Sequence, residues 1–570
     1  MRDQRSATQI LFGFLPDQTV DAKGSVWKVS HWRQPGAIRR VYTDGLRSEL
    51  KRLASPWEAA GTDDGFVQDM HARTDLEVVS VSREDGVQLE PFPRVWVCRT
   101  CNRIHDAPTG NCQCGSSDAR GQLPFVGFHS GCGDLIAPYL PRCPTHKQVR
   151  VRWPGTSSAR EIQFECPVCN RVTQRGFVAR NCTCGVGDPR YVFQVHRASS
   201  VFTPRSCVMV NPPSNERIQE ITDAGGPARA LRWVLDGMAP GGIRAGRPTR
   251  DALTRELKAT GLSDAVIAAM VQAAEAAGEL ADDPVPVALP EAVREEAEKE
   301  AVTIALSMAE PRATIAVLRE RSAHDPVLAG IHGARYGAAL SVAGLETVEL
   351  IDRFPVLTAQ FGYTRGGGAP GEDRLRTYRT PRGGYTIYGD LAQTEALLFW
   401  LAPLRVHAWL VAQGYSLPPA ADDRAARVAI LSSAVVPHYG QDPDDGLGSA
   451  LLTLVHSYAH RVVRAASVFA GIERSALSEL LVPRHLGFYV YGAARGDFVL
   501  GGLQAVFDTE LHRLLDAVVH DESRCALDPG CTTSGGACPA CLHLGEPSCR
   551  AFNRYLDRGV LFGDGGYLRA

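Results

Sequence analysis

The cysteines of this 570-residue chain are clustered. Eleven of the sixteen lie between Cys98 and Cys207, five lie between Cys525 and Cys549, and the long stretch between these clusters has none. Small secreted domains that depend on disulfides carry cysteines throughout their length. The clustering therefore favours metal sites over disulfides.

Two stretches of the first cluster have nearly the same sequence. Each has the form C-x-x-C-Asn-Arg, then a hairpin, then Asn-C-x-C-Gly. Two thiolate pairs joined by a hairpin fit a tetrahedral zinc ion, and four sulfurs leave no open position for catalysis. Reduced buried cysteines or disulfides are the alternative. We expect a duplicated structural zinc ribbon with these ligands: Cys98, Cys101, Cys112 and Cys114 in one copy, and Cys166, Cys169, Cys182 and Cys184 in the other.

A possible further zinc site lies between the repeats. His129 and Cys132 are three residues apart, as are Cys143 and His146, which is the spacing of mixed zinc ligands. Histidines also occur as ordinary core or surface residues. A cross-braced RING arrangement would use these ligands in alternation and would make the protein a protein-interaction adaptor. Since each flanking quartet is complete by itself, we favour ribbons.

The C-terminal cluster offers five cysteines for one zinc site. Cys538-Pro-Ala-Cys541 forms the knuckle, and Cys531 and Cys549 complete the tightest quartet. Cys525 is the alternative ligand. We therefore expect three zinc ions, with a fourth at His129 to His146.

Composition indicates several globular domains. The hydrophobic content of 44% is sufficient for packed cores, and the length exceeds that of one ordinary domain. No signal peptide and no apolar run of membrane-spanning length is visible, so we expect a cytoplasmic protein without a membrane partner. The expected fold class is multidomain α+β, in five segments: an N-terminal mixed α/β segment (1–90), a zinc-ribbon region (91–210), a helical domain (211–325), an α/β helicase-associated domain (326–524) and a C-terminal four-cysteine zinc cluster (525–570).

Hydrophobic periodicity predicts individual elements in the C-terminal half. Spacings of three and four residues predict helices over 395–413 and 449–469. Alternating or short apolar runs predict the following strands: 346–351, 379–390, 427–436 and 487–493. Alternation of strands and helices is typical of an α/β layer structure.

Arginine-rich stretches are candidates for DNA contact. Residues 141–210 contain eleven basic and three acidic side chains, although the net charge of the whole chain is −2. Such an excess attracts phosphate, and arginine favours bidentate contacts; an ordinary solvated surface is the alternative. The Gly-rich stretch 361–384 is expected to be a mobile loop with tyrosines for base stacking. The candidate DNA contacts are Arg171, Arg175, Arg180, Arg365, Arg374 and Arg376.

Catalytic motifs are not apparent. The phosphate-binding loop G-x-x-x-x-G-K-[ST] is missing, so the chain carries no P-loop ATPase site. His456 and His460 share one helix face and could form the metal site of a nuclease, although such histidines more often pack in a core. We expect a non-enzymatic protein.

The C-terminal part resembles a known family. The stretches HSYAHRVVRAAS from His456, GFYVYGAARGDFVLGGLQAVFD from Gly487 and CPACLHLGEPSCRAFNRYLDRGVL from Cys538 occur in an order that resembles the helicase-associated domain of some bacterial superfamily 2 helicases. This domain is also found in DrmB proteins of the DISARM phage-defence system. ELIDRFPVLTAQFGYTR from Glu349 is similar to the segment that precedes it.

The resemblance implies a non-ATPase subunit that partners a DrmA-like superfamily 2 helicase. Such a subunit would help the helicase bind DNA, single-stranded or at a duplex end, in defence against phage. By the same resemblance, the C-terminal quartet of Cys531, Cys538, Cys541 and Cys549 corresponds to the family's zinc ligands. Asp497, Gly501 and Gly502 fall on its GD-x-x-x-GG turn.

Overall fold

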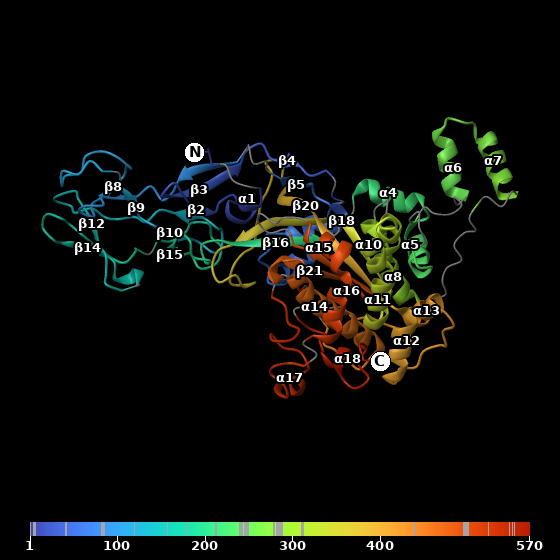
Figure 1. Cartoon of the computed structure of the whole chain (residues 1–570). Helices are drawn as coiled ribbons and strands as arrows, with labels where there is room; N and C mark the ends of the chain where they lie inside the picture. Colours follow the sequence, from blue (N-terminus) through green and yellow to red (C-terminus); the bar gives the residue numbers. More distant parts are fainter. Residues whose placement is uncertain are drawn as a thin grey trace. The chain divides into compact units, whose positions relative to one another are not determined.

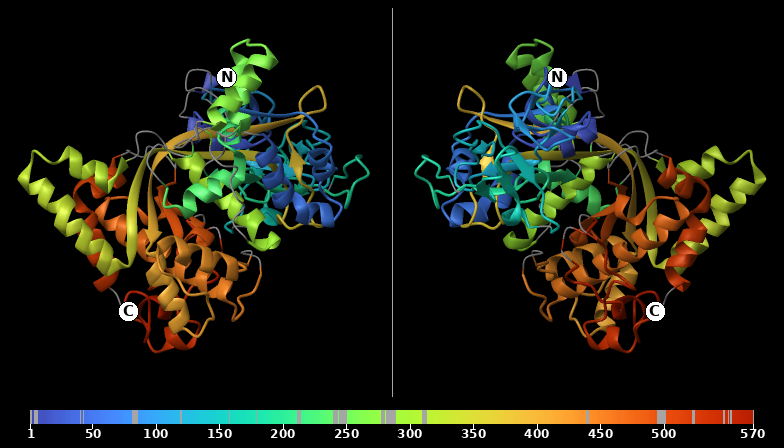
Figure 2. Two further views of the ribbon diagram at one scale, coloured as in Figure 1. Left: turned by 90° about the vertical axis from the view of Figure 1, so that its right-hand side faces the viewer. Right: turned by 90° about the vertical axis from the view of Figure 1, so that its left-hand side faces the viewer.

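A computed structural model shows a mixed α/β chain with two compact units (Figures 1 and 2). The units comprise Met1–Met209 with Leu357–Leu391, and Val210–Val356 with Ala392–Ala570. A multidomain mixed α/β protein is thus confirmed, while the five-segment division stays a prediction. The structure describes residues 2–3, 7–39, 41, 43–80, 86–118, 120–156, 158–178, 180–210, 214–238, 243, 250–276, 280, 289–308, 313–437, 441–493, 501–521, 524–545, 548–549, 551 and 553–569.

The first unit begins with a four-stranded antiparallel sheet. Its order is β1-β6-β3-β2, with β1 at Arg2–Asp3, β2 at Thr19–Ala22, β3 at Ser25–Trp32 and β6 at Val87–Pro91. Helix α1 (Ala7–Gly13) leads into Phe14, which packs in one core cluster with Val29, Trp32 and Leu89. Helices α2 (Thr43–Ala59) and α3 (Phe66–His71) contribute to a second core.

Three small sheets follow, and the segments that connect their strands contain most of the cysteines. The first contains β7 (Trp96–Val97), β8 (Ile104–His105) and β9 (Gly121–Gln122). The second contains β10 (Phe125–Phe128), β11 (Leu135–Ile136) and β15 (Val192–Val195), and the third β12 (Arg150–Arg152), β13 (Gln163–Glu165) and β14 (Val172–Arg175). Their main apolar core is small: Val95, Val97, Leu123, Phe125, Val149, Val151, Ile162 and Phe164. A core of this size needs additional cross-links for stability.

Two long strands, β18 (Leu345–Thr364) and β20 (Tyr385–Leu401), have residues in both units. Within the first unit, β20 pairs in parallel with β5 (Leu76–Ser80), and β18 pairs with β19 (Arg376–Thr377). β4 (Gly36–Ala37) extends this sheet beside β5, and β16 (Thr203–Val210) lies beside β18. The stretch between β18 and β20, predicted to be a mobile loop, therefore contains a strand, and its Tyr378 is buried.

In the second unit, β20 pairs with β22 (Gly487–Gly492), which pairs with β21 (Leu477–Val482), and β17 (Ala313–Thr314) pairs with β18. Helix α14 (Leu447–Phe469) packs against β21 and β22, and most of its residues are buried. The other helices are α4 (Asn215–Asp223), α5 (Gly226–Leu235), α6 (Arg250–Ala259), α7 (Asp264–Ala276), α8 (Glu291–Ser307), α9 (Ile315–Arg321), α10 (Pro326–Gly330), α11 (Tyr336–Ala343), α12 (Pro403–Ala412), α13 (Asp423–Ser433), α15 (Gly502–Ala505), α16 (Leu511–His520), α17 (Gly530–Thr533) and α18 (Gly559–Phe562).

Two predicted elements of this unit are wrong. Residues 395–401 belong to strand β20, and only from Pro403, at the start of α12, is the predicted helix present. Every residue from Thr394 to Leu401 is buried, so the run shows no strand alternation and is easily taken for a helix. The predicted strand 427–436 lies mostly in α13, whose N-terminus is capped by the carboxylate of Asp422.

Within the described residues, no helix is both long enough and apolar enough to span a membrane.

Candidate metal centres

Among the residues that the structure describes, five groups of side chains bring their potential ligand atoms within 4.8 Å of one another. We name each group by its first residue. They are the Cys98 site (Cys98, Cys101, Cys112, Cys114), the His129 site (His129, Cys132, Cys182, Cys184), the Cys143 site (Cys143, His146, Cys166, Cys169), the Cys525 site (Cys525, Cys531, Cys538, Cys541) and the His456 site (His456, His460, Glu479, Cys549).

The Cys98 site contains the four cysteines predicted for the first repeat. Its sulfurs are 3.7 Å apart between Cys98 and Cys114 and 3.6 Å apart between Cys101 and Cys112. A zinc–sulfur bond of about 2.3 Å places the corners of a tetrahedron about 3.8 Å apart, whereas a disulfide would need about 2.05 Å. The thiols are free, and their spacing fits a metal ion.

The quartet predicted for the second repeat is not formed. Cys166 and Cys169 lie with Cys143 and His146, and the other two predicted ligands, Cys182 and Cys184, lie with His129 and Cys132. The sulfurs of Cys143 and Cys169 are 4.0 Å apart, and those of Cys132 and Cys182 are 3.6 Å apart. The single optional site predicted between the repeats is thus replaced by two complete mixed sites.

Strand pairing explains this exchange. Arg150 of β12 pairs with Glu165 of β13 in antiparallel register, so the turn that precedes β12 meets the turn that follows β13. Similarly, Phe128 of β10 pairs with Val192 of β15, so the residues after β10 meet those before β15. Along the chain, the ligands of the His129 site lie on either side of those of the Cys143 site, so the first site is the outer one and the second the inner one. This nesting differs from the alternation of a RING domain, so the cross-braced ligand arrangement is not formed.

Hydrogen bonds orient the ligands of both mixed sites. His129 is fully buried, and its Nε2 donates to the carbonyl oxygen of Asp188 at 2.7 Å, so Nδ1 faces the sulfurs of Cys132 and Cys184. A second partner of this kind fixes the ring and the tautomer of a metal-binding histidine. At the Cys143 site, backbone N–H groups of His146 and Thr145 lower the pKa of the Cys143 thiol to about 6, against the opposing effect of burial. A thiolate is the form that binds metal.

The C-terminal quartet also differs from the prediction. Cys525 is a member of the site together with Cys531, Cys538 and Cys541, and Cys549 is not. The sulfur of Cys538 lies 3.5 Å from that of Cys525 and 3.7 Å from that of Cys541. Cys549 is drawn away because the segment before it docks on β21, where the backbone N–H of Glu479 donates to the carbonyl of Ser548 at 3.3 Å.

Cys549 belongs instead to the His456 site. Its sulfur lies 3.4 Å from Nε2 of His456, and this nitrogen is 2.9 Å from Nε2 of His460 and 3.0 Å from Oε1 of Glu479. All four side chains are buried. Glu479 was not predicted; its one signal in the sequence is a single acidic residue within the apolar strand LSELLV.

Electrostatics at this site favour positive charge between the ligands. Burial opposes protonation of His460, but Glu479 and Cys549 together outweigh it and raise the pKa of His460 to about 10. Burial would likewise raise the pKa of Glu479, but the two histidines outweigh it and lower this pKa to about 2. His456 and His460 have no solvent-exposed surface, so a phosphodiester cannot reach them. The nuclease alternative is therefore disfavoured.

The six candidate DNA contacts differ in their exposure and in their partners. Arg171, Arg175 and Arg180 are exposed, as expected for a contact surface. Arg365 is 1% exposed and donates to three backbone carbonyls, so its prediction as a DNA contact is wrong. The remaining two, Arg374 and Arg376, both pair with the carboxylate of Asp64.

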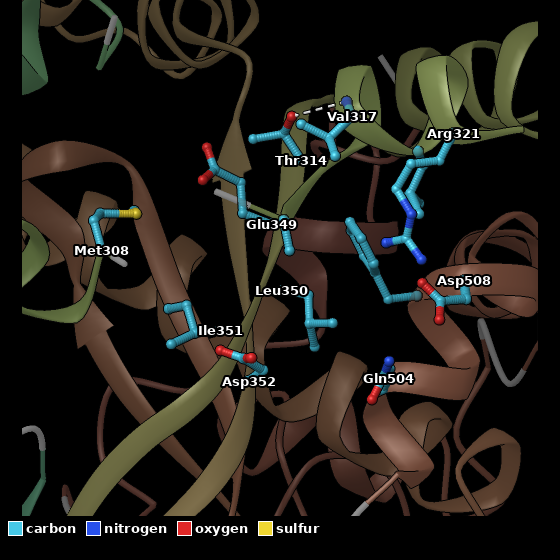
Figure 3. A pocket seen from close by; sticks show the side chains of 13 residues that line it. Met308, Thr314, Val317, Arg321, Glu349, Leu350, Ile351, Asp352, Gln504 and Asp508 are labelled. Atoms are coloured by element: carbon cyan, nitrogen blue, oxygen red, sulfur yellow. Dashed lines mark hydrogen bonds between the residues drawn. The ribbon is translucent and has the colours of Figure 1, made fainter. Parts of the chain in front are cut away.

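A separate cavity of about 290 Å³ lies within the second unit (Figure 3). Its polar lining comes from Arg321, Glu349, Asp352, Gln504 and Asp508, and Figure 3 shows the first and last of these on the same side. None of the predicted site residues lines it. Gln504 is held here because its backbone N–H and that of its neighbour donate to the buried carboxylate of Glu395.

Of the predicted GD-x-x-x-GG turn, the structure describes the last two glycines, which precede the cavity residue Gln504. Gly501 has a φ of 117°, a backbone conformation that favours glycine, and Gly502 begins helix α15. A Cβ atom on Gly502 would lie 2.8 Å from the carbonyl of Ala470. Asp497 lies outside the described residues.

Fold and sites together define a mixed α/β protein with cysteine-rich groups that could hold metal ions. Residues 6–203 match a family described as a domain of unknown function, DUF8724. This range contains the Cys98, His129 and Cys143 sites.

A 121-residue segment is 28% identical to the DISARM protein DrmB of Bacillus paralicheniformis. The segment covers 19% of this chain and 22% of that relative, so the similarity spans about a fifth of the relative's length. The resemblance to DrmB, first indicated by motifs, is thereby confirmed.

Proposed function

We propose that this protein is a zinc-stabilised, non-enzymatic component of a DISARM-type phage defence system, where it partners a superfamily 2 helicase and helps it bind DNA. The similarity to DrmB supports the link to defence. Spacing of the cysteine sulfurs supports zinc, because tetrahedral thiolate and imidazole sites without an open position are typical of structural zinc.

The observation that carries DNA binding is the exposed face of the sheet β12-β13-β14. Val151, Phe164 and Gln174 are buried on one face. On the other face, Arg152 of β12 and Arg175 of β14 are exposed. These two arginines flank Gln163 of β13 in register, so they form one row across the sheet. Arginines in a row on a rigid sheet match the repeating charge of a phosphate backbone.

A partly exposed aromatic side chain directly follows β12, on the side of the sheet that carries Val151. Trp153 follows Arg152 and is 44% exposed. Its ring stacks on that of Phe125, and the two ring centroids are 6.5 Å apart. An exposed indole at the edge of a sheet with arginines on its other face offers a surface on which an unpaired base can stack where the strand passes that edge. The surface therefore favours single-stranded DNA or a frayed duplex end over intact duplex.

DNA binding is tested by measuring the affinity of the purified chain for a fluorescent single strand across a range of salt concentrations. Changing both Arg152 and Arg175 to Gln should weaken binding and reduce the salt slope by about 1.4, because each lost phosphate contact on single-stranded DNA removes about 0.7. Arg52→Gln is the matched control, since Arg52 is an exposed arginine of α2 in the same unit, paired with Glu49. Equal slopes for the double variant and the control would refute this surface.

The partnership is tested by co-expression with a superfamily 2 helicase encoded in the same gene neighbourhood. We expect the two proteins to co-purify, and the pair to bind DNA more tightly than the helicase alone. Separate elution, with no gain in DNA affinity on mixing, would contradict the proposed role.

A further inference from the structure

The His456 site brings together three segments that are distant in the sequence. His456 and His460 are one turn apart on α14, Glu479 comes from β21, and Cys549 from the C-terminal segment (Figure 1). One helical turn places both imidazoles on the same face. The ligand atoms converge on a single point within the second unit.

Hydrogen bonds among the four side chains do not satisfy all of their polar atoms. Nδ1 of His460 donates to the carbonyl of Leu542 at 2.8 Å, so a neutral His460 has a lone pair at Nε2. Oε1 of Glu479, which also presents a lone pair, lies only 3.2 Å from this nitrogen. A neutral His456 could supply one proton at Nε2, which would have to serve Nε2 of His460 and Oε1 of Glu479 at once, and also the sulfur of Cys549 when this is a thiolate.

Two further buried atoms of the site lack a partner. Among the described residues, Oε2 of Glu479 and Nδ1 of His456 have no hydrogen-bond partner, although both are buried. A buried carboxylate without compensation is costly, and a cation within bonding distance removes this cost. The second carboxylate oxygen would then be available for bidentate binding.

We propose that the His456 site binds a zinc ion that fastens the C-terminal segment to α14 and β21. The donor set consists of two imidazoles, one carboxylate and one thiolate, all of which are zinc ligands. Two neutral imidazoles with two anionic ligands exactly balance a divalent cation, so the loaded site is electrically neutral. Neutrality suits its complete burial, whereas a four-thiolate site would carry a charge of about −2.

The site is distinct from the Cys525 site but adjacent to it along the chain. Cys541 belongs to the Cys525 site, and the next residue, Leu542, accepts the hydrogen bond that orients His460. Arg464, one turn further along α14, donates to the carbonyl of Ala540 at 2.8 Å. Metal binding at either site therefore positions the backbone that serves the other. This inference does not depend on DNA binding or on a helicase.

The experiment counts zinc per chain in the purified full-length protein by mass spectrometry of the metal content. We expect five zinc ions in the unaltered chain and four in Cys549→Ala. Cys207→Ala is the matched control, because Cys207 is equally buried but belongs to none of the five groups; it should retain five. Four ions in the unaltered protein, with no loss in Cys549→Ala, would overturn the proposal and leave a hydrogen-bonded network only.

A second variant decides the case in which Cys549→Ala unfolds and loses several ions. Cys549→His replaces the thiolate by an imidazole, which can still bind zinc. Recovery of five ions in Cys549→His supports the metal site. Failure to recover them overturns it, since a residue needed only for packing would not be restored by a ligand of different shape.

Discussion

Arg365 is the residue whose replacement tests the structure most directly. Its guanidinium donates to the carbonyl of Gly133 at 2.8 Å, of Val201 at 2.6 Å and of Asp17 at 3.0 Å. Its carbon atom Cζ also lies 4.9 Å from the ring centroid of Tyr363. Arg365→Met retains the length of the side chain but leaves the carbonyls of two buried residues, Gly133 and Val201, and that of the exposed Asp17 without this donor.

The expected cost follows from the loss of a charged donor by three carbonyls, two of which belong to buried residues. A hydrogen bond with a charged partner contributes about 1.5–3 kcal/mol, and losses within one network do not add fully. We therefore expect Arg365→Met to lower the free energy of unfolding by about 3–5 kcal/mol, which corresponds to a fall in melting temperature of about 10 °C.

Differential scanning calorimetry measures this change, with Arg374→Met as control. Arg374 pairs with Asp64 near the surface, so its loss should cost less than about 1 kcal/mol. The reasoning is refuted if both variants melt at the same temperature while Arg365→Met alone weakens DNA binding. Arg365 would then act at the surface.

Two other perturbations have defined outcomes. Removal of zinc with a strong chelator should open the three small sheets, whose apolar core is small, and change the fluorescence of Trp96 and Trp153; unchanged emission would contradict a structural role for metal. His485 is buried, and this burial, together with the smaller effect of the nearby arginines, lowers its pKa to about 4. The pKa of this histidine in the unfolded chain is about 6.5, so the unfolded chain takes up the extra proton first as the pH falls. The free energy of unfolding should therefore be highest above pH 6.5 and decrease by up to about 3 kcal/mol towards pH 4. Denaturant unfolding of His485→Gln, which can still donate to the carbonyl of Ala297, should lack this decrease, and parallel pH profiles would contradict it.

Local patterns in the sequence were sufficient for some of the sites and elements. The Cys98 site was predictable because its first and last ligands are only 16 residues apart, so sequence distance and spatial distance agree. Helix α14 and strand β22 were predictable for the same reason, since their patterns depend on neighbours within the element.

The His129 and Cys143 sites depend on which distant strands pair. Repetition of the cysteine motif indicated that Cys166 and Cys182 would share a site, but motif spacing contains no information about the partners of β10 and β12. Glu479 was missed because nothing near it in the sequence indicates that it faces His456. Arg365 was misassigned because a Gly-rich stretch was taken as exposed.

The nested order of the His129 and Cys143 sites affects how the region assembles. The inner ligands His146 and Cys166 are 20 residues apart, whereas the outer ligands Cys132 and Cys182 are 50 residues apart. When the inner site forms first, fewer flexible residues separate the ligands of the outer site. The entropic cost of closing the outer loop is then lower by about 0.5 kcal/mol. Metal uptake is therefore expected to run from the inside outwards, and metal loss from the outside inwards. Under zinc limitation, the outer site would empty first and the basic sheet beside the inner site would persist longest.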